Sequence, residues 1–101
     1  RYLELNYADP ITVAQLGTLA CMSGRTLQRH FIAATGVSPL RYLLRVRLAH
    51  ASRLVRETDL TMTEIGDRCG MPNSAYFSRL FHRYAGTSPS AWRKRKDSFG
   101  G

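Results

Sequence analysis

Apolar residues recur at intervals of three and four positions in several segments, and short breaks rich in glycine, serine and proline separate these segments. That spacing places the apolar side chains on one face of a helix. The longest stripe begins after Ser38, a good capping residue, with Pro39 in the first turn, and runs to about Thr58. Its apolar positions are Leu40, Leu43, Leu44, Leu48, Ala51, Leu54 and Val55. The pattern predicts an all-α chain with a long central helix.

The segments on either side of this helix are copies of one another. Residues 12–17 match residues 61–66 at an offset of 49, and residues 36–39 match residues 86–89 at an offset of 50. An internal repeat indicates one structural unit used twice. The one-residue slip falls between the two matched segments, where we expect a turn that tolerates an extra residue.

Each copy opens with a threonine that is followed three residues later by Gln or Glu, which is the capping-box pattern of a helix start. We therefore expect short helices to begin at Thr12 and Thr61. Their apolar faces are Val13, Leu16, Leu19 and Ala20 in the first copy, and Met62, Ile65 and Cys69 in the second.

A second helix follows in each copy after a break at residues 21–24 and 70–73, where Ser23 and Asn73 are good N-caps and Gly70 suits the turn. Gly36 and Gly86 are placed to end these helices. Their expected core positions are Leu27, Phe31 and Ala34 in the first copy, and Phe77, Leu80, Phe81 and Tyr84 in the second. Each copy is thus predicted to be a helix-turn-helix.

We therefore predict two helix-turn-helix subdomains, residues 1–38 and 59–101, joined by a connecting helix at residues 39–58. A half of about fifty residues is marginal as an independent fold, so the connecting helix is expected to supply core to both halves. The sequence begins within what resembles a helix, and we expect it to be a piece of a longer protein.

The charge of the chain indicates a polyanionic partner. Fifteen Lys and Arg against seven Asp and Glu give a net charge of +8, and thirteen of the fifteen are arginine, which suits bidentate contacts with phosphate or guanine. No apolar run is long enough to cross a bilayer, so we expect a cytoplasmic protein without a membrane partner.

The chain shows no pattern of enzyme or metal chemistry. Cys21 and Cys69 are isolated and are expected to be small buried apolar residues, and His30, His50 and His82 lack ligand spacing. The acidic residues do not cluster and no glycine-rich phosphate loop is present. We expect no metal, no cofactor and no catalytic residues.

The second helix of the first copy carries a polar stripe opposite its apolar face. Arg25, Gln28 and Arg29, followed by Ile32, keep the spacing i, i+3, i+4 and i+7. Arginine with guanine and glutamine with adenine are the bidentate pairs that the major groove of DNA permits. Arg25, Gln28 and Arg29 are therefore candidate base contacts.

The matching stripe of the second copy has short side chains except for one arginine, and its candidate base contacts are Ser74, Ala75, Ser78 and Arg79. We expect Arg79 to contact the base pair and the serines to contact phosphate or water. The candidate contacts to the DNA backbone are Thr12, Thr61, Thr63, Arg41, Arg45 and Arg53. For the basic run at residues 93–96 we favour an ordinary charged terminus.

The chain resembles the DNA-binding domain of AraC/XylS-type transcription regulators over essentially its whole length. The residues that carry the resemblance are Ser23, Leu27, Arg29, Phe31, Gly36, Ser38, Pro39, Tyr42, Arg47, Leu48, Ala51, Leu54, Thr63, Glu64, Ile65, Ser74, Tyr76, Phe77, Ser78, Arg79, Phe81, Gly86, Ser88, Pro89, Trp92 and Arg93. It implies about seven helices, two recognition helices in successive major grooves, and the same base-contacting positions. Gly17 and Gly66 stand where the family usually has alanine.

The resemblance also implies promoter DNA and RNA polymerase as partners, with an effector-binding or dimerisation domain elsewhere in the protein. We expect the output domain of an effector-responsive activator. A stand-alone regulator and a helix-turn-helix segment of a DNA-repair alkyl-transfer protein remain alternatives, and a basic RNA-binding protein is a weaker one, because an A-form major groove is too narrow for these helices.

Overall fold

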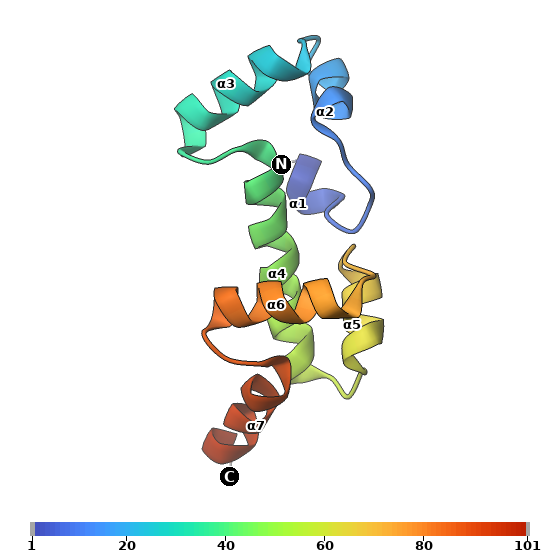
Figure 1. The fold of residues 1–101 in the computed structure, drawn as a ribbon, viewed down its shortest axis with the longest axis vertical. Helices are drawn as coiled ribbons and strands as arrows, with labels where there is room; N and C mark the ends of the chain where they lie inside the picture. The colour runs from blue at the N-terminus through green and yellow to red at the C-terminus, as the bar shows by residue number, and fades with distance from the viewer. Residues whose placement is uncertain (1, 101) are drawn as a thin grey trace. The chain divides into compact units, whose positions relative to one another are not determined.

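The computed structural model describes the backbone of residues 2–100 and the side chains of residues 2–94. Over this part of the chain there are seven helices and no strands (Figure 1). The helices are α1 (Tyr2–Leu5), α2 (Val13–Leu19), α3 (Gly24–Thr35), α4 (Pro39–Glu57), α5 (Met62–Arg68), α6 (Ser74–Ala85) and α7 (Pro89–Gly100). The predicted fold class, with two helix-turn-helix pairs and a long central helix, is confirmed.

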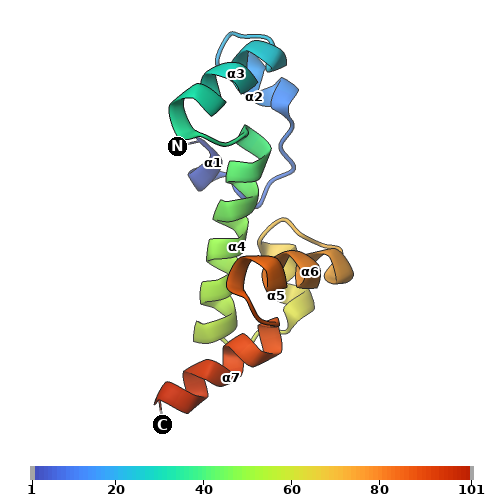
Figure 2. The same cartoon turned by 60° about the vertical axis from the view of Figure 1, so that its left-hand side comes forward.

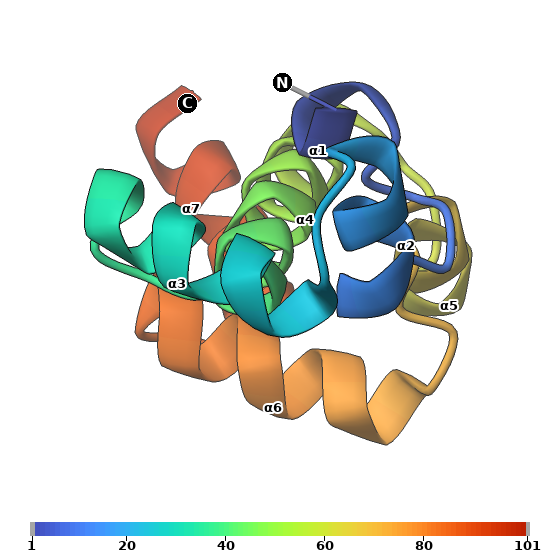
Figure 3. The ribbon, with the colours of Figure 1, turned by 90° about the horizontal axis from the view of Figure 1, so that it is seen from above.

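The chain divides into two compact units, Arg1–Val46 and Arg47–Gly101. The boundary falls inside α4, so the first part of this helix packs in the first unit and the rest packs in the second. Within the first unit α2 and α3 lie next to one another (Figure 3), and within the second α5 and α6 form the equivalent pair (Figure 2).

The helix starts and ends follow the local chemistry of the sequence. Thr12 and Thr61 form complete capping boxes with Gln15 and Glu64. The side chains of Ser23 and Asn73 accept hydrogen bonds from the backbone at the starts of α3 and α6. Helices α3 and α6 end at Gly36 and Gly86, which take left-handed conformations with φ of 83° and 77°. These boundaries were all predicted.

The core of the first unit is small. Leu3, Leu16 and Leu43 are buried, and Tyr7, Ile11, Leu27, Phe31 and Tyr42 pack around them half-buried. Helix α3 has no buried residue at all. The expected core positions Leu19, Ala20 and Ala34 are exposed, with Leu19 at 60%. Helix α1 is a single turn, and Leu19 is left at the edge of an apolar groove of about 270 Å³ that Tyr2 and Leu3 also line.

The second unit has a fully buried aromatic core. Phe77 and Phe81 are 0% exposed, and their rings meet edge to face with centroids 5.9 Å apart. Trp92 of α7 meets Phe81 in the same way at 6.4 Å. Tyr84, expected in this core, is 46% exposed, since it lies in the last turn of α6 beyond the buried pair.

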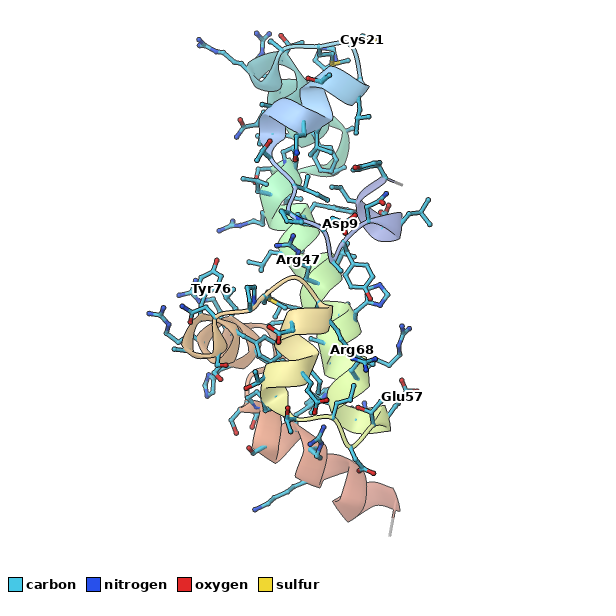
Figure 4. The ribbon with its side chains drawn as sticks, turned by 90° about the vertical axis from the view of Figure 1, so that its right-hand side faces the viewer. Asp9, Cys21, Arg47, Glu57, Arg68 and Tyr76 are labelled. Atoms are coloured by element: carbon cyan, nitrogen blue, oxygen red, sulfur yellow. The ribbon has the colours of Figure 1, made fainter. Side chains whose placement is uncertain are left out.

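The two cysteines differ. Cys69 is buried as predicted, and desolvation raises the pKa of its thiol to about 11. Cys21 is exposed, so its predicted burial is wrong; Figure 4 shows it on the turn between α2 and α3. The repeat aligns Cys21 with Gly70, and both have positive φ, 58° and 81°. Cys21 thus occupies the left-handed position of the turn, outside the core.

The turn of each helix pair crosses closely over a glycine. The N–H of Met22 donates to the carbonyl oxygen of Gly17 at 2.7 Å, and the N–H of Met71 donates to Gly66 at the same distance. A Cβ atom on Gly66 would lie 2.5 Å from the carbonyl oxygen of Met71. The absence of a side chain allows this approach.

The difference between the cores gives a first prediction. Phe81→Ala should lower the free energy of unfolding of its unit by about 3–5 kcal/mol, because it empties a fully buried site. Phe31→Ala, at the matching position of the first unit, should cost about 1–2 kcal/mol because Phe31 is half-buried. Urea denaturation followed by far-UV circular dichroism measures both, and fluorescence of Trp92, the single tryptophan, reports the second unit. Equal losses would contradict the difference in packing.

Candidate nucleic-acid interface

Helix α3 presents Arg25, Gln28 and Arg29 to solvent, all three exposed. They lie on the side of the helix opposite Leu27 and Phe31, which pack on the core of the first unit. The cap at Ser23 fixes the start of the helix, so these residues occupy its first two turns. Ile32 continues the same stripe by one turn and is 44% exposed.

Helix α6 presents Ser74, Ala75, Ser78 and Arg79, and all four are exposed. Burial of Phe77 and Phe81 fixes the rotation of this helix and turns the four candidates away from the core. The exposed stripe continues to His82, three residues after Arg79. His82 is not among the predicted contacts, although the repeat aligns it with Ile32, which continues the stripe of the first copy.

The starts of α2 and α5 carry the candidate threonines. The hydroxyls of Thr12 and Thr61 accept hydrogen bonds from the N–H groups of Gln15 and Glu64, at 3.2 and 3.1 Å. A hydroxyl that accepts keeps its own proton to donate. Thr63 is exposed, and its hydroxyl lies 3.4 Å from that of Ser74, which joins the first turns of α5 and α6.

The Glu64 carboxylate completes the cap of α5. It accepts a hydrogen bond from the backbone N–H of Thr61 at 3.0 Å. Hydrogen bonds from the backbone and side chain of Thr61 lower the pKa of Glu64. The carboxylate is therefore charged at neutral pH and holds the N-terminus of α5 in place beside Thr63.

The candidate arginines of α4 are exposed, but they are not equivalent. Arg41 and Arg45 belong to the first unit. Arg53, in the second, forms an ion pair with Glu57 at 3.6 Å and lies 3.1 Å from Nδ1 of His50. Burial and the neighbouring Arg53 both lower the pKa of His50. Arg53 therefore has neighbours of its own on α4, although its ion pair with Glu57 is solvent-exposed.

Two further arginines are half-buried, and one of them has a structural role. Arg47 of α4 is half-buried near Tyr76 and Cys69, and desolvation lowers the pKa of its guanidinium (Figure 4). Arg93 donates from Nε to the carbonyl of Val55 and from Nη2 to that of Leu60, both at 2.8 Å.

The interpretation of residues 93–96 as an ordinary charged terminus is therefore wrong for Arg93. Its guanidinium satisfies the Val55 carbonyl in the last turn of α4. The indole N–H of Trp92 donates to the carbonyl of Ser52, further back in the same helix, at 3.0 Å. Lys94 is exposed, and the side chains of Arg95 and Lys96 lie outside the described residues.

No helix of the described residues has the length and apolar character to cross a bilayer. Within the same part of the chain, no three histidine, cysteine or acidic residues gather as metal ligands would.

Two helix-turn-helix pairs, each with an exposed second helix whose polar stripe carries arginine, define a DNA-binding domain. A family model described as a helix-turn-helix domain matches residues 16–95. A probable AraC family transcriptional regulator from Rhodopseudomonas palustris is 34% identical, with a TM-score of 0.84 over 94% of this chain and 90% of that one. The chain belongs to the AraC-type helix-turn-helix family.

Two other relatives are informative. The DNA-binding domain of AdpA, described as a global transcriptional factor and solved in complex with a target DNA, is 31% identical, with a TM-score of 0.90 over 96% of this chain and 87% of that one. The transcriptional activator RhaS of Shigella boydii is 39% identical over 98 residues, which cover 97% of this chain and 35% of that protein. The chain thus spans about a third of the length of this relative, and its relatives are transcription regulators rather than enzymes.

The Arg93 contacts give a second prediction. Arg93→Met keeps the aliphatic stem but removes two hydrogen bonds from a charged donor, so it should lower the free energy of unfolding by about 1–3 kcal/mol. Lys94→Met, on the exposed neighbouring residue, should change it by less than about 0.5 kcal/mol. Thermal unfolding of the two variants measures the difference, and similar melting temperatures would show that the contacts do not stabilise the unit.

Proposed function

We propose that this chain is the DNA-reading output domain of an effector-responsive bacterial transcription activator. The observation that carries the proposal is that one chain presents two recognition helices with different exposed side chains, Arg25, Gln28 and Arg29 on α3 against Ser74, Ala75, Ser78 and Arg79 on α6. Identical helices suit palindromic sites, whereas two unlike helices on one chain suit an asymmetric site.

The first unit makes the stronger base contacts in this proposal. Arg25 and Arg29 can each donate two hydrogen bonds to guanine, and Gln28 can pair with adenine. In the second unit Arg79 is the one long donor of the four candidates, so Ser74 and Ser78 contact phosphate or water. Sequence-dependent shape of the DNA then contributes more of the specificity in this half.

The backbone contacts come from two kinds of residue. Thr12, Thr61 and Thr63 offer hydroxyl protons at the starts of α2 and α5, and Arg41 and Arg45 add exposed positive charge. Arg53 belongs to the proposed set, and to reach a phosphate it would give up its exposed contacts with Glu57 and His50.

The partners follow from the family. The RhaS relatives are named activators and are about three times as long as this chain. We propose that the remaining part of this protein carries an effector-binding or dimerisation domain, and that the bound domain contacts RNA polymerase at promoters in the cytoplasm.

Selection from a pool of random duplexes tests the proposal. The chain, as a monomer, should recover an asymmetric site of roughly two helical turns, with strong base preferences in one half and weaker ones in the other, because its two recognition helices differ. Recovery of a perfect palindrome, of a motif confined to half a turn, or of no preferred duplex would reject the tandem arrangement.

Arg29→Ala tests the base contact itself. On the preferred site it should weaken binding by about 1–3 kcal/mol and remove the preference at one base pair, because a bidentate pair is lost. Arg83→Ala, an exposed arginine of α6 outside the proposed contacts, serves as a control. Binding titrations on the selected and on a scrambled duplex distinguish the cases: an equal loss on both would mean that Arg29 contacts only phosphate.

A further inference from the structure

The second unit contains a hollow beside α6 whose surface is mostly apolar but which polar side chains also line. The hollow has a volume of about 410 Å³ and is lined by Met62, Ser78, Arg79, His82, Ser88, Pro89 and Ser90. Pro89 is buried and Met62 half-buried, whereas the other lining residues are exposed. The hollow therefore combines a largely apolar surface with the polar groups of its exposed lining residues, and the candidate base contact Arg79 is one of these.

The walls supply hydrogen-bond donors and no carboxylate. Arg79 carries a permanent charge, and His82 donates from its ring. The Ser88 hydroxyl accepts from the N–H of Ala91 at 3.2 Å and so belongs to the cap of α7. Among the described residues the hydroxyls of Ser78 and Ser90 have no hydrogen-bond partner, so both can donate to a ligand. A group with several acceptor oxygens and a negative charge fits such a set.

The first unit shows that the fold itself does not require these side chains. At an offset of 50, His82 matches Ile32 and Ser90 matches Leu40. Ile32 and Leu40 are 44% and 47% exposed, so the apolar residues are no more part of a core than their polar counterparts. These two positions are apolar in the first unit and carry hydrogen-bond donors in the second, which favours a ligand specific to the second unit.

We propose that this hollow binds one phosphate of the DNA backbone, with His82 and Ser90 as its donors, next to the base pair that Arg79 contacts. The inference rests on the proposed function, since the ligand is part of the DNA site. It also explains how a recognition helix with mostly short side chains is held in register: the backbone contact positions the helix, and Arg79 supplies the base contact.

Single methylphosphonate linkages, which remove the charge of one phosphate, test the proposal. A series of duplexes carries one such linkage at each position of the preferred site in turn. Wild-type protein should lose about tenfold in affinity at the linkage held by the hollow, which is one of several sensitive linkages in the weaker half of the site. The double variant His82→Ile, Ser90→Leu should bind the unmodified duplex about tenfold more weakly and be nearly insensitive to that same linkage.

The variants are matched to the structure. Ile and Leu are the residues that the first unit carries at these positions. His82→Ala, which removes one donor from an exposed position, should also reduce the penalty at that linkage and gives an independent measurement should the double variant unfold at a lower temperature. Arg83→Ile serves as the control, because Arg83 is exposed on α6 but does not line the hollow. It should keep the full penalty at the sensitive linkage.

The outcomes distinguish failure of the proposed function from failure of the phosphate site. Wild-type protein that shows no preferred duplex rejects the proposed function and, with it, this site. Wild-type protein that binds its site, together with hollow variants that keep the full penalty at every linkage, rejects the phosphate site alone.

Discussion

The rest of each unit depends on the backbone crossing at one glycine. At Gly66 the carbonyl of Met71 comes so near that a Cβ atom would lie 2.5 Å from it, and Phe77 packs against the same spot. The hydrogen bond from Met71 to Gly66 closes the turn at this point. Because the turn cannot open without losing that bond, the direction in which α6 leaves it is fixed. The first unit repeats the arrangement with Gly17 and Met22. The exposed faces of α3 and α6 follow from this crossing, since it decides which side of each helix is left for a ligand.

The two units anchor their recognition helices differently. Helix α6 is anchored by the fully buried side chains of Phe77 and Phe81. The next helix, α7, is joined to α4 by the hydrogen bonds of Trp92 and Arg93. Helix α3 has no buried residue and rests on half-buried Leu27 and Phe31. The unit whose candidate base contacts have longer side chains thus has the less buried core, and the unit whose candidates are short has the more buried core. Long side chains lose rotamer freedom when they bind, whereas a firmly held helix with short side chains loses little. We therefore expect the first unit to lose more conformational entropy on binding DNA than the second.

The sequence was sufficient where the physics is local. Capping residues, turn glycines and the apolar period predicted the helix pairs and the central helix, and the same period placed every candidate base contact on an exposed face. It was insufficient where the burial or the contacts of a residue depend on another helix. Periodicity put Leu19 and Tyr84 on apolar faces, but whether anything covers those faces depends on the lengths of α1 and α6. The contacts of Arg93 with Val55 and Leu60 join residues more than thirty positions apart, so no local pattern shows them. Cys21 is different, because its alignment with Gly70 carried the signal of an exposed left-handed turn.

The same contacts change what the net charge means. A charge of +8 suggests a surface on which every arginine is available to a polyanion. Within the described residues, however, Arg93 is held by two carbonyls, Arg47 is half-buried and Arg53 faces Glu57. Counterion release on binding depends on the number of phosphates that are neutralised at the interface, not on the total charge of the chain. On the proposed contacts, we expect the salt dependence of this domain to come from Arg25, Arg29, Arg41, Arg45 and Arg79, and the half-buried Arg47 and Arg93 to add to it only through the long-range field.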